Sequence, residues 1–147
     1  MAYWLVKTEP SAWSWEDQLR DKTTFWNGVR NWQASNNLKK MMVGDLVFFY
    51  HSVNERTVVG IVKVCKKYYP DHTDKSKRFG MVDVKIFNTL KKPVSLSEIK
   101  SRKELSHLAL VRQSRLSVMP IDSKSWKIIC KMADTKVKSH ILFYLLI

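Results

Sequence analysis

The sequence predicts one α+β domain, in which a small, strongly curved sheet or barrel carries helices at its periphery. The 147 residues are about the length that a single hydrophobic core serves. Segments of β character outnumber helical ones, and the chain contains neither a regular series of βαβ units nor an internal repeat. A hydrophobic fraction of 45% and a charged fraction of 27% are typical of soluble globular proteins, which excludes a mainly disordered chain.

The first third of the chain is predicted to contain two strands and a capped helix. Residues 3–6 (YWLV) are a short β-prone run. Ser14 is followed three residues later by Asp17, which resembles a capping box, so a helix should begin there. Residues 46–50 (LVFFY) are continuously apolar, which indicates a strand that is buried on both faces.

The middle of the chain is predicted to hold two further strands and a loop. The β-branched run 57–64 contains Gly60, where a bulge or a close packing contact is expected. Residues 66–80 are basic and turn-rich, which predicts a mobile loop. The alternation in residues 81–87 (MVDVKIF) predicts a strand with one solvated face.

The last third is predicted to contain two helices and a segment of β character. Ser95 and Glu98 form a second capping box, which should open a helix. Residues 108–119 return to β character before Pro120. Asp122 or Ser123 is expected to cap a last helix. The buried face of that helix should carry Trp126, Ile129 and Cys130.

The charge balance points to a polyanionic partner. The formal net charge is +13, and the sequence pI is near 9.9. Residues 63–103 contain twelve basic and four acidic side chains, so most of the excess lies there. Nucleic acid is the first partner to consider, because a basic surface gains free energy from counterion release. An acidic membrane is the second, and a merely lysine-rich, soluble surface is the alternative to both.

The cysteine pattern and the termini predict a soluble, intracellular protein without metal or cofactor. Cys65 and Cys130 lie far apart, with no CxxC motif and no paired histidines, which argues against a disulfide framework and a zinc site. No signal peptide is visible at the N-terminus. The apolar run 141–147 is too short to cross a bilayer as a helix. We expect a cytoplasmic location, or a nuclear one if the source is eukaryotic.

Few residues suggest enzymatic chemistry. The chain has no GxSxG, P-loop, GxGxxG or HExxH motif. His51 directly follows the buried strand, where it is either a base or a structural hydrogen-bonding group. Lys7, Thr8 and Glu9 offer an amine, a hydroxyl and a carboxylate, although consecutive residues of a strand point to alternate faces.

Two segments combine polar side chains with aromatic or aliphatic ones. Residues 26–37 contain two tryptophans, one arginine, four asparagines and one glutamine. Indole faces can stack a nucleobase, and amide groups can pair with its edge. The alternative is a core tryptophan beside an Asn-rich cap, in a region whose apolar anchors are Trp32, Leu38 and Met41. In residues 110–120, Arg, Gln and Ser alternate with aliphatics, which fits either a pocket wall or a solvated edge strand.

Seven segments, in order along the chain, resemble motifs of the EVE domain family. They are residues 3–10 (YWLVKTEP), 26–34 (WNGVRNWQA), 43–45 (VGD), 50–52 (YHS), 81–84 (MVDV), 93–96 (PVSL) and 115–118 (RLSV). The resemblance implies a PUA-like fold, a small pseudo-β-barrel with peripheral helices. It also implies an EVE domain over residues 1–132, with residues 133–147 as a C-terminal helix or strand extension of the same domain. Asn27 departs from the family's usual aspartate, and Trp32 from its usual tyrosine.

The resemblance further implies a non-enzymatic module that reads a modified, flipped-out base of DNA or RNA in an aromatic and polar pocket. Carried over by motif, the expected ligand-binding residues are Lys7, Thr8, Trp26, Val29, Asn31, Gln33, Ala34, Tyr50, His51, Ser52, Arg115, Leu116 and Ser117. Trp26 should face a pocket bounded by Asn31, Tyr50, His51 and Ser52. The alternative function is that of a small PUA-like hydrolase or nuclease of the ASCH type, with Lys7, Thr8, Glu9 or His51 as its reactive groups.

Overall fold

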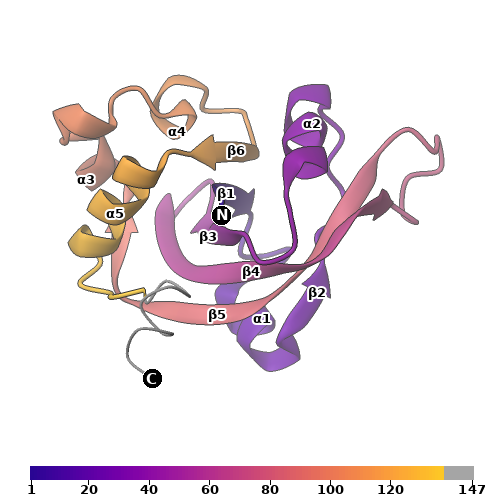
Figure 1. The fold of residues 1–147 in the computed structure, drawn as a ribbon, viewed down its shortest axis with the longest axis horizontal. Coiled ribbons are helices and arrows are strands. Elements are labelled where there is room, and N and C mark those ends of the chain that lie inside the picture. The colour runs from indigo at the N-terminus through magenta and orange to yellow at the C-terminus, as the bar shows by residue number, and fades with distance from the viewer. Residues whose placement is uncertain (138–147) are drawn as a thin grey trace.

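The protein folds around one strongly curled sheet of six strands, in the order β2-β5-β4-β3-β1-β6 (Figure 1). The structure is a computed structural model, and it describes residues 1–137. The strands are β1 (Tyr3–Thr8), β2 (Thr23–Phe25), β3 (Leu46–His51), β4 (Thr57–Pro70), β5 (Gly80–Ser95) and β6 (Val118–Ile121). The helices are α1 (Trp15–Asp21), α2 (Trp32–Lys40), α3 (Leu96–Lys100), α4 (Ala109–Arg112) and α5 (Ser123–Met132), with a 3-10 turn at Lys103–Leu105. The predicted α+β, barrel-like architecture with peripheral helices is confirmed.

Strand β3 is the centre of the sheet, and every one of its residues is buried, as its continuously apolar sequence predicts. It pairs in parallel with β1, so that Thr8 lies opposite His51, and antiparallel with β4. Strand β1 also pairs antiparallel with β6. The C-terminal ends of β1 and β3 therefore lie side by side, which brings the two motifs at residues 7–9 and 50–52 together.

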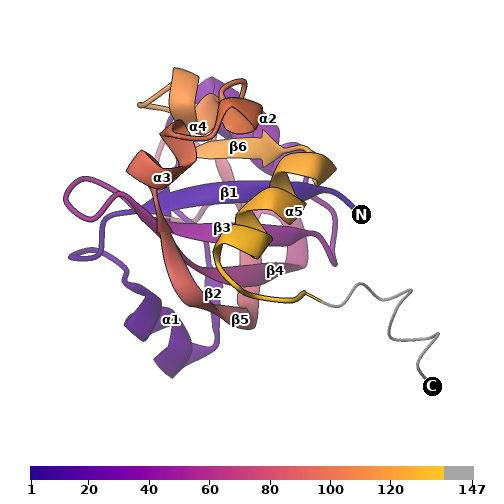
Figure 2. The same ribbon diagram turned by 90° about the vertical axis from the view of Figure 1, so that its left-hand side faces the viewer.

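Aromatic residues pack on both faces of β3. Phe48 stacks on Trp126 of α5 at a centroid distance of 3.8 Å, and Figure 2 shows α5 lying across β1 and β3. The next residue, Phe49, points to the opposite face, where its ring meets the edges of Trp15 at 5.0 Å and Trp26 at 5.5 Å. The last helix begins at the predicted cap, because the Asp122 side chain accepts a hydrogen bond from the Ser125 amide.

Gly60 lies at a shift in the β4–β5 register, where the sequence predicts a bulge. A Cβ atom at this position would lie 2.3 Å from the Trp15 ring. The absence of a side chain at Gly60 therefore allows α1 to pack directly on the sheet.

Both capping boxes predicted for α1 and α3 are present.

Three predictions about local structure are wrong. Residues 66–80 do not form a mobile loop, because β4 and β5 extend as a paired hairpin and only residues 71–79 lie between the strands. The segment 108–119 is largely not a strand; it forms the short helix α4, and β6 begins only at Val118. Trp32 is not an apolar anchor, since 53% of it is exposed, whereas Leu38 and Met41 are fully buried.

The C-terminal extension is only partly described. Residues 133–137 form a turn and a short irregular segment, in which Ala133 is buried. The apolar run 141–147 lies outside the described residues, so the proposed division at residue 132 stays a prediction. Within residues 1–137, no helix is both long enough and apolar enough to span a bilayer.

Candidate nucleic-acid interface

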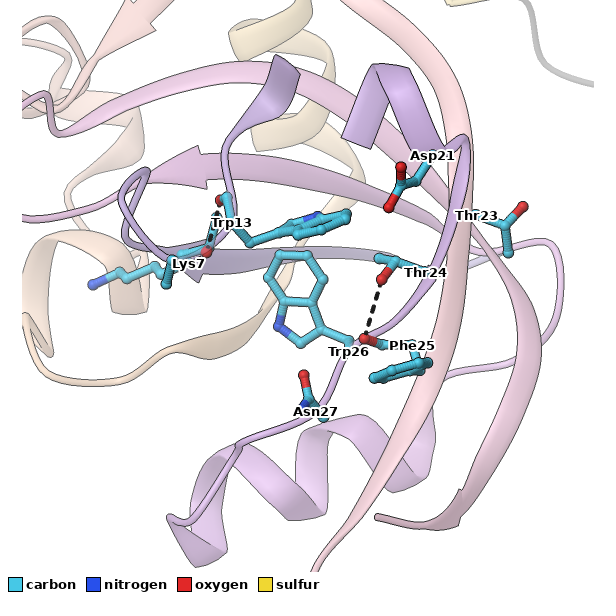
Figure 3. Close-up of a pocket in the computed structure, with 10 residues that line it drawn as sticks. Lys7, Trp13, Asp21, Thr23, Thr24, Phe25, Trp26 and Asn27 are labelled. Atoms are coloured by element: carbon cyan, nitrogen blue, oxygen red, sulfur yellow. Dashed lines mark hydrogen bonds between the residues drawn. The ribbon is translucent and has the colours of Figure 1, made fainter. Parts of the chain in front are cut away.

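A pocket of about 440 Å³ lies where the end of β1, the segment before α1, and the end of β2 meet (Figure 3). We call it the aromatic pocket. Its wall consists of Lys7, Thr8, Ala12, Trp13, Asp21, Thr23, Thr24, Phe25, Trp26 and Asn27. Pockets that hold small molecules commonly measure 300–1,000 Å³ and combine apolar walls with a few polar groups. This pocket fits that description.

Two indole rings, those of Trp13 and Trp26, belong to the apolar part of the pocket wall, and each is fixed by hydrogen bonds of its residue. The Trp26 amide donates a hydrogen bond to the Val82 carbonyl oxygen at 2.7 Å, and only 7% of the residue is exposed. The Trp13 indole nitrogen donates to the Gln18 side-chain oxygen at 2.9 Å. Gln18 is itself fully buried and donates to the carbonyl oxygen of Lys22. In Figure 3 the two rings point toward one another, so the walls are set before any ligand enters.

Polar groups stand at the ends of the aromatic pocket. Asp21 and Thr24 lie beside the Trp13 ring, and the Asn27 side chain points toward Trp26 (Figure 3). The Asp21 carboxylate accepts one hydrogen bond, from Arg20 Nε at 2.9 Å, which leaves lone pairs for a ligand. A carboxylate is the acceptor that matches an exocyclic amino group of a base. The pocket can therefore stack a flat ring and accept from its edge.

A second hollow, of about 670 Å³, adjoins the aromatic pocket, because Lys7 and Thr8 line both. We call it the basic groove. Its other lining residues are Glu9, Tyr50, Ser52, Val53, Arg56, Leu96, Lys100, Leu110, Val111, Ser114, Arg115 and Ser117. Four basic side chains thus face one carboxylate. Such a groove attracts a polyanion, and the low-dielectric walls concentrate its field.

Lys7 lies at the boundary between the pocket and the groove. Its ammonium group donates to the Ser114 carbonyl oxygen at 2.9 Å and lies 5.7 Å from the centre of the Tyr50 ring. Burial lowers the pKa of Lys7, because desolvation disfavours the charged form. Burial likewise raises the pKa of Tyr50. The amine is therefore held in position by the main chain of the segment before β6.

A third hollow, of about 330 Å³, continues the groove, with Ser114 and Arg115 common to both. It also contains Arg112 and two residues at the start of α2, Asn31 and Gln33. The Asn31 side chain accepts a hydrogen bond from the Ala34 amide at 2.9 Å, which makes it the N-cap of α2. The asparagine thus has the structural role that the alternative interpretation of this segment predicted.

The thirteen residues expected to bind a ligand do not converge on one pocket. Lys7, Thr8 and Trp26 line the aromatic pocket. The groove adds Tyr50, Ser52, Arg115 and Ser117, and the third hollow adds Asn31, Gln33 and Leu116. Val29, Ala34 and His51 are buried and line none of the three hollows. Trp26 thus lines a different hollow from Asn31, Tyr50 and Ser52, and the other indole of its pocket is that of Trp13.

The groups of the hydrolase alternative are engaged elsewhere. The His51 Nε2 atom accepts a hydrogen bond from the Trp15 amide at 3.0 Å, and Nδ1 lies 2.5 Å from Glu55. Both ring nitrogens are thus occupied by structural contacts. Among residues 1–137, Lys7 forms no ion pair with Glu9, and no group of three metal-ligating side chains is present.

Several residues that line the hollows are not among the site residues that the sequence predicts. Trp13, Asp21 and Thr24 lie outside the seven segments that resemble family motifs, although an indole just before a helix cap is a local signal for Trp13. Arg56 precedes β4 and Lys100 ends α3, which follows β5. The antiparallel pairing of Thr57 with Ser95 brings these two segments together at one end of the ladder, which the sequence alone does not indicate.

Comparisons with known proteins agree with this architecture. The family model described as "EVE domain" matches residues 2–132. Thymocyte nuclear protein 1 of Gallus gallus is 35% identical, over 91% of this chain and 69% of its own length. The NMR structure of a Rhodopseudomonas palustris protein is 42% identical, with a TM-score of 0.88, and the match covers 95% of this chain and 98% of that one.

Two further solved structures bear on function and fold. The human THYN1 protein in complex with DNA containing 5-methylcytosine is 29% identical, with a TM-score of 0.86, over 93% of this chain and all of that one. A mutant ASCH protein from Zymomonas mobilis matches 90% of this chain and 99% of that one, with a TM-score of 0.56 but 6% identity, and so shares the fold alone. Because the family model matches residues 2–132 and the Gallus gallus relative aligns with 91% of this chain, the chain belongs to the EVE domain family.

Proposed function

We propose that the protein is a non-enzymatic DNA-binding module that holds a modified, extruded base in the aromatic pocket while the basic groove binds the flanking phosphates. The observation that carries the proposal is the junction of the two hollows at Lys7 and Thr8. Stacking and edge contacts would identify the base, and charge would position the backbone. Binding of an extruded base therefore requires a site for the base and a site for the flanking phosphates, next to one another.

The human relative supports DNA with 5-methylcytosine as the first ligand to test. The Trp13 and Trp26 indoles would contact the ring, one of them as the stacking platform, and the Asp21 carboxylate would accept from an exocyclic amino group such as that of cytosine. Asn27, whose side chain points toward Trp26, would contact the remaining edge. In the groove, Arg56, Lys100 and Arg115 would bind phosphate, with Lys7 at the boundary.

A non-enzymatic role also fits the state of the reactive groups. His51 is held by Trp15 and Glu55, and the Lys7 ammonium is bonded to a carbonyl oxygen. A general base must reach its proton donor directly or through one water, and neither group has a free partner of that kind here. The ASCH likeness extends to the fold only.

The experiment is a binding titration of two duplexes that differ in a single methyl group, one with 5-methylcytosine and one with cytosine. Wild-type protein should prefer the methylated duplex. Trp13→Ala should weaken binding to it by about 1–3 kcal/mol, the usual cost of losing one stacking platform. The matched control is Trp32→Ala, which removes an exposed indole outside the pocket and should keep the ratio of the two affinities. Equal binding of both duplexes by wild-type protein would contradict the proposal.

The class of ligand can be checked independently. Nucleosides released from nucleic acid that stays with the purified protein, analysed by mass spectrometry, should be enriched in a modified base relative to the bulk nucleic acid of the host. The same analysis on Trp13→Ala protein should lose that enrichment. A composition identical to the bulk in both samples would contradict a reader function.

A further inference from the structure

The hairpin formed by the end of β4 and the start of β5 projects from the sheet, on the side of the molecule away from α5 (Figure 1). We call residues 66–80 the hairpin arm. Its strands are paired up to Pro70 and Gly80, so that the connection consists of residues 71–79. The arm lies outside the aromatic pocket and the basic groove, none of whose lining residues belongs to it.

In the hairpin arm the basic side chains are exposed and the acidic side chains are buried. Its five basic residues, Lys66, Lys67, Lys75, Lys77 and Arg78, are all exposed. Its two acidic residues, Asp71 and Asp74, are 3% and 8% exposed. The field outside the arm is therefore more positive than its composition suggests, because both carboxylates are turned inward.

The inward carboxylates make the tip rigid rather than neutralising the lysines. The Asp74 carboxylate accepts hydrogen bonds from the Ser76 hydroxyl and from the amides of Phe79, Ser76 and Arg78. These bonds, the one from the hydroxyl first, hold the pKa of Asp74 well below its ordinary value. Among residues 1–137, the side chains of Lys75, Lys77 and Arg78 form no ion pair and donate no hydrogen bond. Three cations are thus presented to solvent on a preformed turn.

The arm is fastened to the segment that forms the aromatic pocket. The Asp71 carboxylate accepts from the Gly28 amide at 2.8 Å and from the Arg30 guanidinium at 2.9 Å. The His72 ring meets Phe25, a pocket residue, edge-on at 4.8 Å. The pocket therefore has the groove at its Lys7 end and the arm at its Phe25 end (Figure 3).

We propose that the hairpin arm is a second phosphate-binding surface, which holds the polynucleotide backbone on the opposite side of the extruded base from the basic groove. The inference rests on the proposed function and adds a partner contact to it. A nucleic-acid strand with one base in the pocket continues in both directions from that base. Basic side chains lie on both sides of the pocket, in the basic groove and on the hairpin arm. A two-stranded β-ribbon is also of a size that the major groove of a duplex admits.

The test compares two triple variants that remove the same charge. Lys75→Gln/Lys77→Gln/Arg78→Gln neutralises the tip of the arm. Lys124→Gln/Lys127→Gln/Lys131→Gln neutralises three exposed lysines of α5, on the other side of the molecule. Affinity for the duplex with 5-methylcytosine is measured against salt concentration, and melting temperature checks that both variants fold, as the exposure of all six side chains leads us to expect.

The arm variant should flatten the slope of log K against log salt by about 2–3, since each phosphate contact contributes roughly 0.9. Its affinity should fall about tenfold or more at 0.1 M salt. The ratio between methylated and unmethylated duplexes should stay as in wild type, because no pocket residue changes. The α5 variant should keep the wild-type slope.

The outcomes separate this inference from the proposed function. If wild-type protein prefers the methylated duplex but the two triple variants have the same slope, the arm is not a contact surface and the inference is overturned. If only the arm variant flattens the salt slope, and wild-type protein binds the methylated and unmethylated duplexes equally, the arm is confirmed as a contact surface. The proposal of a modified-base reader is then overturned. Salt-independent binding by wild-type protein would overturn both.

Discussion

Trp26 belongs to the core and to the pocket wall at the same time. Its amide is bonded to Val82, its ring edge packs on Phe49, and it is 7% exposed, yet it lines the aromatic pocket. Trp13 faces it from a half-buried position. A substitution of Trp26 should therefore affect both folding stability and ligand binding, whereas a substitution of Trp13 should affect mainly ligand binding.

Truncation of Trp26 should damage folding before it damages binding. Trp26→Ala is expected to lower the free energy of unfolding by about 3–5 kcal/mol, because it leaves a cavity against Phe49. Chemical denaturation measures this loss. Trp13→Ala is the comparison and should cost clearly less, since part of that ring already faces solvent. A loss below about 1 kcal/mol for Trp26→Ala would contradict its place in the core.

Asp71 couples the hairpin arm to the pocket segment, and its ionisation should contribute to acid unfolding. Burial alone would raise its pKa, but hydrogen bonds from Thr73, Gly28 and Arg30 outweigh it and lower the pKa to about 2. A carboxyl group whose pKa is depressed in the folded state stabilises the protein above its unfolded-state pKa. That contribution is present above about pH 4 and is lost as the pH falls toward 2.

Asp71→Asn should flatten the loss of unfolding free energy between about pH 4 and pH 2, and denaturant titrations across that range measure it. Asp122→Asn is the matched control. Hydrogen bonds from His107 and Ser125 outweigh the effect of burial and also lower the Asp122 pKa to about 2. Both variants should lose acid sensitivity, but only Asp71→Asn should reduce the preference for a methylated duplex. Unchanged preference in Asp71→Asn would show that the pocket segment keeps its shape without this contact.

At the scale of elements, the contact between α1 and the sheet depends on Gly60. The Trp15 ring occupies the space where any side chain at this position would lie, and its indole nitrogen donates to the Thr89 hydroxyl on β5. The capping box of Ser14 and Asp17 starts the helix in the register that this contact needs. Trp13 and Trp15 are thereby set on either side of the cap, one facing the pocket and one facing the sheet.

Gly60→Ala should therefore destabilise the protein by about 1–3 kcal/mol through overpacking, or more if the ring does not move. Thermal melting measures the loss. In the double variant Gly60→Ala/Trp15→Phe, the smaller ring should make the combined loss less than the sum of the single ones. Strictly additive losses would show that the new methyl group does not contact Trp15.

At the scale of the molecule, the net charge of +13 has two arranged portions, one in the basic groove and one on the hairpin arm. The aromatic pocket lies between them. A ligand that contacts only the pocket should feel little of this charge, whereas a polynucleotide should feel both portions.

Binding of a duplex should accordingly depend steeply on salt. With four to six phosphates neutralised, log K should fall against log salt with a slope of roughly −4 to −5. Free 5-methyldeoxycytidine, which has no phosphate, should bind with a slope near zero. Titrations at several salt concentrations measure both slopes. Equal slopes for the nucleoside and the duplex would contradict a backbone contact.

Much of the fold could be predicted because its signals are local. The continuously apolar pentapeptide 46–50 predicted β3. Side-chain caps predicted the first residues of α1, α3 and α5, because a capping side chain bonds to an amide only three residues away. The candidate site was predicted as a set of motifs, of which Lys7, Thr8 and Trp26 do share a pocket. The set as a whole does not converge.

What the tertiary structure decided depends on partners far away in the sequence. Residues 66–70 pair as a strand because β5 supplies hydrogen bonds and Asp71 and Asp74 satisfy the turn, although their composition is typical of a loop. Trp13 and Trp26 line one pocket because the chain, after β2, places Trp26 next to Trp13 in space (Figure 3). The sequence by itself determined the class of fold, the helix starts and the basic character of the protein. Which side chains face one another was decided by strand pairing, because a pocket is a property of neighbours in space, and those neighbours come from separate elements.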